Sequence, residues 1–283
     1  MIKILRVEQW TKNFIIFIPT ILANNFQVLS SYKIYIVFLS FSLLASSTYI
    51  FNDIKDVEQD RIHPEKKFRP LASGSLNLKV ASIYLLVLLI LSFLIIYIIN
   101  YDLILLYFAY LTITIFYSSK LKYIKYLDFL SITVLFGIRI LIGASAARVE
   151  LTTSFILFLL FILTLISVGK KLSILNNKNI SGDSGVKKHL VNSYSSLELQ
   201  RLCSSLSFLS LLVFVFWNFQ NLNFPSLQLI VSILSIILLY IFNRTFINDS
   251  VNAATENFVE WIITSKNLYI VTLLCLLTLI IIY

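Results

Sequence analysis

The sequence has little charge, glycine, proline or cysteine. Only 13% of its 283 residues are charged, and it contains 6 glycines, 4 prolines and 2 cysteines. So few charges exclude an ordinary soluble protein, and no low-complexity tract is evident. The two cysteines, Cys203 and Cys275, stand in apolar stretches without the spacing of metal ligands. We therefore interpret them as packing residues.

Apolar residues, by contrast, make up 58% of the chain, and its mean hydropathy is +0.88. A spanning helix needs about 20 apolar residues, and such stretches recur along the whole length. Because apolar residues run continuously rather than alternating, we predict an all-α polytopic membrane protein with one domain, residues 1–283. The first predicted span is short and contains Pro19, which favours a tilted or broken helix. The nine predicted spans are 14–28, 33–52, 78–99, 102–119, 127–147, 152–172, 200–219, 225–243 and 267–283.

Basic residues are distributed unevenly around these spans. Lys and Arg concentrate at the N-terminus and in the connections after the second, fourth, sixth and eighth spans, whereas the opposite side carries only Lys33 and Arg148. The positive-inside rule therefore predicts a cytosolic N-terminus and cytosolic charged loops, with the C-terminus outside. The net charge of +9 is explained by this topology and by anionic headgroups, without a nucleic-acid partner. We expect no cleavable signal peptide, because no small-residue cleavage site follows a short apolar core.

The most informative charged segment is residues 52–74, NDIKDVEQDRIHPEKKFRPLASG. On a helix, Asn52, Asp56 and Asp60 are spaced by four residues and share one face, and Asp53 flanks the same cluster. Carboxylates gathered at a membrane boundary repel each other unless a cation lies between them. Mg²⁺ is the expected ion, because it binds through carboxylates together with substrate phosphates. Many charged loops are merely solvated and topogenic, but three aspartates at this spacing favour a metal site.

Basic residues follow the aspartates directly and complete a cradle for a metal-bound diphosphate. Mg²⁺ would neutralise the diphosphate as a leaving group. Arg and Lys side chains would stabilise the charge that develops on it. These basic residues are Arg61, Lys66, Lys67 and Arg69.

A second group of aromatic and basic residues lies in the segment FYSSKLKYIKYLD, residues 116–128. Such residues mark membrane interfaces in general. The alternative is that Tyr117 and Lys122 face the same cavity as the aspartates and that one of them binds a phosphate oxygen. The sequence leaves both interpretations open.

Three further basic residues are candidates for a site. Arg139 lies deep in an apolar run, where a charge costs at least ~2.5 kcal/mol, so it is either a site residue or the structural partner of an acid on another helix. Lys170 and Lys171 end the sixth predicted span. Lysines there often serve only as helix-dipole partners and snorkelling anchors. The alternative is that they hold an anion.

The run NDIKDVEQD resembles the N-D-x-x-D-x-x-x-D signature of the UbiA superfamily of intramembrane prenyltransferases. The sequence is most similar to the decaprenyl-phosphate phosphoribosyltransferase branch, and the resemblance covers nearly the whole chain. The opening QWTKN, residues 9–13, also fits this branch. The other matching residues are His63, Pro64, Lys66, Phe68, Arg69, Pro70, Ala72, Gly74, Tyr117, Ser118, Leu121, Lys122, Asp128, Gly169, Lys170, Lys171, Tyr194, Ser195, Leu197 and Glu198.

The resemblance implies a nine-helix bundle around a cavity open to lipid, in a bacterial plasma membrane. It implies that a polyprenyl phosphate attacks the anomeric carbon of 5-phosphoribosyl 1-diphosphate and that diphosphate leaves, yielding a lipid-linked sugar precursor for the cell envelope. The catalytic and metal-binding residues would be Asp53, Asp56 and Asp60, helped by Asn52 as a metal ligand. The substrate-binding residues would be Lys12, Lys66, Lys67, Arg69, Tyr117, Lys122, Arg139, Lys170 and Lys171. Membrane lipids are expected partners, and both dimers and trimers are compatible with the apolar faces.

Two other functions compete with this one. A prenyl diphosphate transferase acting on an aromatic or quinone acceptor would carry a second pair of carboxylates on a later helix. Residues 167–201 instead hold lysines, with Asp183 and Glu198 as the only acids. A non-catalytic lipid transporter would show paired repeats and broken helices at matching places, of which the sequence offers little.

Overall fold

A computed structural model describes residues 2–22, 26–62, 66–177, 193–220 and 227–252. The secondary structure of these residues is entirely helical, which confirms the all-α prediction. The chain divides into two compact units, one of residues 1–21 and 25–150 and one of residues 22–24 and 151–283. The single domain predicted for residues 1–283 stays a prediction.

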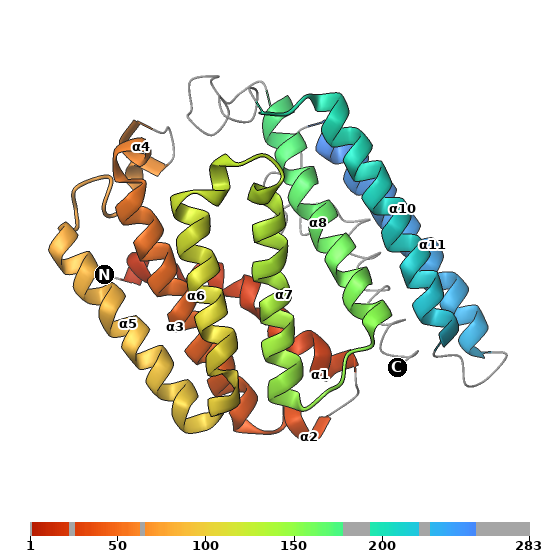
Figure 1. Ribbon diagram of the computed structural model, residues 1–283, viewed down its shortest axis with the longest axis horizontal. Coiled ribbons are helices and arrows are strands. Elements are labelled where there is room, and N and C mark those ends of the chain that lie inside the picture. Colours follow the sequence, from red (N-terminus) through yellow and green to blue (C-terminus); the bar gives the residue numbers. More distant parts are fainter. Residues whose placement is uncertain (1, 23–25, 63–65, 178–192, 221–226, 253–283) are drawn as a thin grey trace. The chain divides into compact units, whose positions relative to one another are not determined.

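The helices up to residue 150 are shown in red to green in Figure 1. In chain order they are η1 (Ile2–Leu5), η2 (Val7–Phe17), α1 (Ile18–Leu22), α2 (Phe26–Leu29), α3 (Tyr32–Lys55), α4 (Val57–Ile62), η3 (Lys66–Phe68), α5 (Leu78–Ile99), η4 (Tyr101–Leu103), α6 (Ile104–Ser119), η5 (Leu121–Tyr123) and α7 (Leu127–Ala147). The helices after residue 150 are α8 (Thr153–Asn176), α10 (Ser196–Gln220) and α11 (Leu227–Val251).

Six of the predicted spans coincide with helices that are long and apolar enough to cross a membrane. These helices are Tyr32–Lys55, Leu78–Ile99, Tyr101–Ser119, Leu127–Ala147, Thr153–Asn176 and Ser196–Asn218. The protein is therefore a membrane protein. Helix α11 covers the predicted span 225–243, and the predicted span 267–283 lies outside the described residues. The count of nine stays a prediction.

In its described residues the first predicted span, 14–28, is broken, which is one of the two forms that Pro19 led us to expect. The chain there consists of the end of the 3₁₀ helix η2 and the short helices α1 and α2. Pro19 stands at the second position of α1, where the missing N–H costs nothing, but a helix cannot continue through it from η2 without losing a hydrogen bond. The segment is apolar because Ile16 and Phe17 are buried within the first unit.

The core of the first unit is built from aromatic rings on α3 and α6. Phe41 packs edge-on against Tyr107 and Tyr110, with ring centroids 5.6 and 4.7 Å apart. The Tyr107 hydroxyl donates to the carbonyl of Val37 over 3.2 Å, which satisfies its polar end inside the core. This hydrogen bond between the two helices fixes the position of α6 along the axis of α3.

Helix η2 is held between α3 and α7. Asn13 of η2 donates to Ser42 Oγ over 3.0 Å and accepts from Arg139 Nε over 3.0 Å. Gly143, one turn beyond Arg139 on α7, lets η2 approach closely, since a Cβ there would lie 2.0 Å from the Ile16 carbonyl oxygen. Only glycine fits this contact. The N-terminal segment is therefore packed into the unit along its length.

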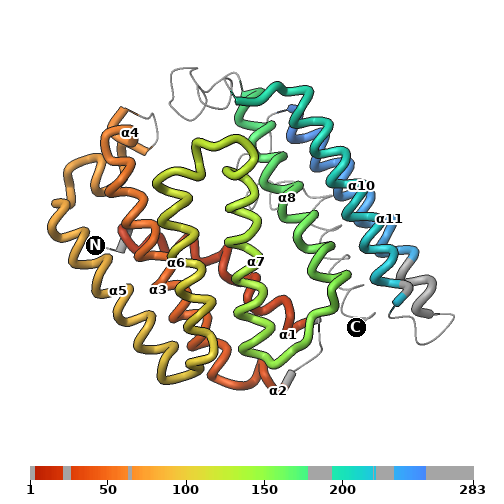
Figure 2. The backbone as a smooth tube through the Cα atoms, viewed as in Figure 1, coloured from red at the N-terminus to blue at the C-terminus, as the bar shows by residue number. Residues whose placement is uncertain are grey.

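In the second unit, α8 packs against α10, and α10 and α11 run side by side (Figure 2). Phe155 and Phe158 of α8 stack with Trp217 and Phe214 of α10, respectively, at ring distances of 5.1 and 4.9 Å. Gly169 of α8 faces α11, and a Cβ there would lie 2.3 Å from the Phe246 ring, so this glycine permits the close packing of the two helices.

Candidate active site

The acidic segment crosses a break between two helices. Helix α3 ends at Lys55, Asp56 caps it, and α4 begins at the next residue. The Asp56 N–H donates to the Asn52 carbonyl over 2.9 Å, and the Asp60 N–H donates to the Asp56 carbonyl over 2.8 Å. The first of these hydrogen bonds closes α3 and the second opens α4, so Asp56 links the two helices.

Asp53 and Asp60 are both buried and share one guanidinium. Arg69 Nη1 lies 3.2 Å from Asp53 Oδ1 and 2.5 Å from Asp60 Oδ2. The side chains of these aspartates are only 6% and 4% exposed, so the charge-assisted hydrogen bonds form where water is largely excluded. Arg69 therefore joins the end of α3 to α4.

Asp56 pairs with a different basic residue. Lys122 Nζ donates to Asp56 Oδ1 over 2.6 Å, and Lys122 stands in η5, directly after α6. Tyr117 is half-buried in the last turns of α6, which leads into η5. The structure therefore brings the basic and aromatic segment 116–128 to the acidic segment.

The lysines that follow the aspartates differ in exposure. Lys66 is half-buried, and burial lowers its pKa, helped by the positive charge of Arg69, while Asp60 and Asp56 act in the opposite sense. Lys67 is exposed and lies over the Phe68 ring at 5.2 Å. Arg61 is exposed too and pairs with Glu58 at 2.9 Å. Of these three, only Lys66 is half-buried.

Sequence reasoning missed one residue of this cluster, Arg6. Its guanidinium donates to Asp53 Oδ1 and lies 5.7 Å from the Tyr49 ring centroid. Arg6 has φ 48°, a left-handed conformation that is uncommon outside glycine and tends to occur at functional sites. The only signal in the sequence was its place three residues before the QWTKN segment.

The donor set at this cluster fits Mg²⁺ in its chemistry. Carboxylates and carboxamide oxygens are hard ligands. The Asn52 Oδ1 atom is buried and has no hydrogen-bond partner among the described residues, which leaves it open to a cation. Each carboxylate faces a basic side chain, and within the described residues no three acidic, histidine or cysteine side chains converge as a metal group. The metal role of Asn52, Asp53, Asp56 and Asp60 stays a prediction.

Arg139 lies in the interior of the first unit with neutral partners. Besides Asn13, it donates to the Leu135 carbonyl at 2.8 Å and to the Tyr110 hydroxyl at 2.9 Å. Its guanidinium also lies 5.0 Å from the Phe136 ring. The sequence left open an acid on another helix as the structural partner of Arg139. The structure shows neutral partners instead, and these contacts give Arg139 a structural role. Its predicted contact with substrate stays a prediction, as does that of Lys12, which is exposed on η2.

Lys170 and Lys171 belong to the second unit. They lie inside α8, which continues for more than a turn beyond them to Asn176, so they do not end the helix as the predicted span 152–172 implied. Lys170 is exposed, and Lys171 is half-buried with its Nζ 5.6 Å from the Tyr194 ring. Their part in substrate binding stays a prediction.

Comparison with known proteins shows the family to which this chain belongs. The family model for the UbiA prenyltransferase family matches residues 14–263. The decaprenyl-phosphate phosphoribosyltransferase of Mycobacterium tuberculosis is 28% identical over 226 residues, which cover 78% of this chain and 74% of the relative. The uncharacterized protein y4nM of Sinorhizobium fredii is 37% identical over 142 residues, but these span only 27% of that longer relative and 49% of this chain.

Solved structures show the same fold at low sequence identity. A structure of digeranylgeranylglyceryl phosphate synthase is 22% identical, with a TM-score of 0.67, and the match covers 99% of this chain and 95% of that one. A UbiA homolog from Archaeoglobus fulgidus bound to GPP and Mg²⁺ is 16% identical, with a TM-score of 0.64 and coverage of 99% and 98%.

Proposed function

We propose a reaction for this chain, which belongs to the UbiA prenyltransferase family. In this proposal it transfers the 5-phosphoribosyl group of 5-phosphoribosyl 1-diphosphate to a polyprenyl phosphate. One observation carries this proposal: the buried or half-buried carboxylates of the acidic segment are paired with the cations Arg6, Arg69 and Lys122. Such an arrangement suits a donor with several phosphate groups. The similarity to decaprenyl-phosphate phosphoribosyltransferase supports the same donor and acceptor.

In the proposed reaction an oxygen of the lipid phosphate forms a bond to the anomeric carbon of the ribose. The bond between that carbon and the diphosphate breaks, and its electron pair leaves with the diphosphate. The transition state is oxocarbenium-like, and the attacking phosphate is already ionised near neutral pH, because its second pKa is about 6. The chain therefore needs no strong general base at this site.

The basic residues have two tasks in this proposal. Arg69 and Lys66 bind donor phosphate oxygens, and Arg69 keeps its fork orientation through Asp53 and Asp60. Lys122, held by Asp56, faces the acceptor side and stabilises charge on phosphate oxygens.

The carboxylates would hold the metal that the family uses. We propose Asn52, Asp53, Asp56 and Asp60 as its ligands. When bound, Mg²⁺ supplies Lewis-acid neutralisation of the departing diphosphate. The presence of Mg²⁺ in the Archaeoglobus fulgidus homolog supports this choice of ion.

A prenyl diphosphate transferase acting on an aromatic or quinone acceptor is the alternative that the family allows. The Archaeoglobus fulgidus homolog was solved with GPP, which favours a prenyl diphosphate donor for that protein. In this chain, the described residues of 167–201 carry a single acid, Glu198, beside Lys170 and Lys171. This composition suits direct contact with anions better than a second metal site.

The direct test is a transfer assay with purified full-length protein. Radiolabelled 5-phosphoribosyl 1-diphosphate is incubated with a polyprenyl phosphate and Mg²⁺, and label is counted in the organic phase. Label in that phase is the expected result. Transfer seen only with a prenyl diphosphate and an aromatic acid would favour the alternative, and transport of a lipid phosphate between leaflets without any transfer would favour a transporter.

The same proposal places the protein in a bacterial plasma membrane as a multi-pass protein, with its N-terminus and active-site loops in the cytoplasm. The clustering of Lys and Arg on one side of the spans supports this orientation. Labelling single cysteines in whole cells tests it: a cysteine at Lys33 should react with an impermeant reagent, whereas a cysteine at Lys67 should not.

A further inference from the structure

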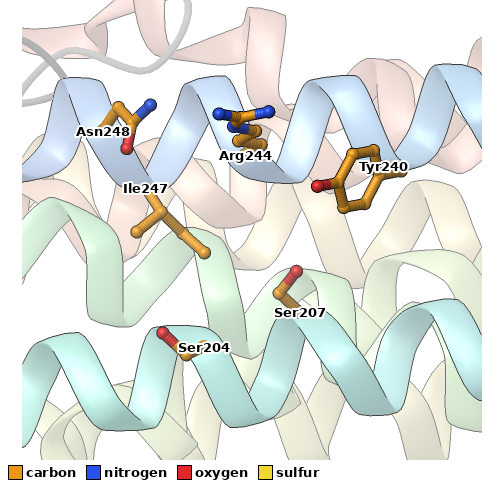
Figure 3. A pocket seen from close by; sticks show the side chains of 6 residues that line it. All are labelled: Ser204, Ser207, Tyr240, Arg244, Ile247 and Asn248. Carbon is orange, nitrogen blue, oxygen red and sulfur yellow. The ribbon is translucent and has the colours of Figure 1, made fainter.

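A groove of about 210 Å³ lies between α10 and α11 in the second unit. The hydroxyls of Ser204 and Ser207 rise from α10 toward α11, which contributes Tyr240, Arg244 and Asn248 (Figure 3). The two helices are antiparallel here, because Ser204 lies toward Asn248 and Ser207 lies toward Tyr240, so the residue numbers rise in opposite directions (Figure 3). The groove therefore combines one cation with several neutral hydrogen-bond donors.

The donors at the groove are available to a ligand. Within the described part of the chain, Arg244 and Tyr240 make no side-chain hydrogen bond or ion pair, and the Ser207 hydroxyl makes none either. Arg244 and Tyr240 are also exposed, Tyr240 to 51%. A guanidinium, a phenol and an aliphatic hydroxyl around one hollow form a site for an anion with several oxygens.

The position of the groove along the helices indicates which kind of anion it meets. Arg244 comes one residue after the predicted span 225–243, so it lies at headgroup level at the end predicted to be cytosolic. An exposed arginine at that level attracts anionic headgroups, and the phosphates of anionic lipids are the abundant counter-ions there.

Below the polar groove, the same helix faces become apolar and exposed. Ile237 and Ile233 precede Tyr240 on α11 at helical spacing and are 49% and 50% exposed. Phe208 and Leu212 follow Ser204 on α10 at intervals of four residues and are 65% and 52% exposed. A ligand with a phosphate head and acyl chains matches this order of polar and apolar side chains.

We propose that the groove binds the phosphate of an anionic glycerophospholipid from the cytosolic leaflet. Arg244 contacts the phosphate, the hydroxyls of Tyr240 and Ser207 donate to its oxygens, and the acyl chains lie along the apolar faces of α10 and α11. This lipid is a bound partner of the protein, separate from the two substrates of the transfer reaction, and its binding does not depend on the proposed activity.

Native mass spectrometry of the full-length protein tests the proposal. The protein is titrated with phosphatidylglycerol or phosphatidylcholine, and bound lipids are counted for the wild type, for Arg244→Gln and for the double variant Ser207→Ala, Tyr240→Phe. We expect preferential binding of phosphatidylglycerol, weakened about fivefold by Arg244→Gln and at least about twofold by the double variant. The double variant keeps the charge and decides the matter if Arg244→Gln fails to fold.

Lys79→Gln is the matched control, because it removes one exposed positive charge near the start of another helix, α5. It should leave binding of phosphatidylglycerol unchanged. Equal loss in Lys79→Gln and Arg244→Gln would mean that net charge alone attracts the lipid, which overturns the proposal. Unchanged binding in the double variant would do the same, and so would full displacement of the lipid by soluble glycerol 3-phosphate, since the site would then recognise a free phosphate.

Discussion

Replacing Gly143 by alanine probes how η2 is positioned against α7. The new Cβ would lie 2.0 Å from the carbonyl oxygen of Ile16 and 2.8 Å from its carbonyl carbon. Both are backbone atoms, so no side chain can turn away. Since an ordinary contact begins at 3.4 Å, η2 would have to move by about 1.4 Å.

The change should reduce activity far more than stability. Overpacking costs about 1–3 kcal/mol, while exchanging glycine for alanine within a helix returns about 1 kcal/mol. The net loss of folding free energy is therefore about 1 kcal/mol. The same segment carries Arg6, which holds Asp53, and a displacement of about 1 Å near reacting groups can lower turnover about 100-fold.

The assay measures turnover by label transfer and the melting temperature of each purified variant. Ser145→Ala is the control, because it is an equally small change at an exposed position of α7. The control should keep wild-type turnover. Wild-type turnover in Gly143→Ala would refute the idea that η2 positions the acidic cluster, and a parallel collapse of folding and turnover would show that Gly143 serves stability alone.

Three other predictions concern the cluster and the second unit. Asp56→Asn should abolish turnover, because it removes a carboxylate that holds Lys122, while Asp102→Asn, at an exposed position in η4, should not; transfer by Asp56→Asn would remove this carboxylate from the mechanism. EDTA should stop transfer and added Mg²⁺ should restore it, whereas turnover that persists in EDTA would contradict the metal role. Gly169→Ala should destabilise the protein by about 1 kcal/mol, because its Cβ would lie 2.3 Å from the Phe246 ring and overpacking costs more than the helix gains from alanine. Adding Phe246→Leu to Gly169→Ala should recover part of that loss in thermal unfolding, because leucine is smaller than phenylalanine. No recovery in this double variant would mean that another contact limits stability.

Continuous apolar stretches predicted most of the described helices well. Helices α3, α5, α7 and α10 contain their predicted spans. A backbone in lipid must satisfy its own hydrogen bonds, so a long apolar stretch is enough to predict a helix there. For the segment 14–28, Pro19 indicated the break, but the sequence could not show whether the segment is buried or faces lipid, because both environments demand the same apolar residues. Composition alone cannot distinguish Ile16, packed under α7, from a residue that faces lipid.

Part of the candidate site was accessible from the sequence and part was not. The regular spacing of Asp53, Asp56 and Asp60 predicted that they act together, since the spacing is a local property of a helix. The pair of Asp56 with Lys122 joins residues that are 66 positions apart, and the sequence offered their meeting in one cavity only as one of two open interpretations. Arg6 had no comparable signal, because its contact with Asp53 depends on a left-handed turn and on the packing of η2.

The most direct test of the central claim is the binding of 5-phosphoribosyl 1-diphosphate to the purified full-length protein, measured by equilibrium dialysis with radiolabelled donor. The account predicts that the wild type binds the donor in the presence of Mg²⁺, and that Arg69→Gln and Asp53→Asn each weaken binding at least about tenfold, while Lys79→Gln does not. Undiminished binding by both cluster variants would place the donor elsewhere and contradict the account.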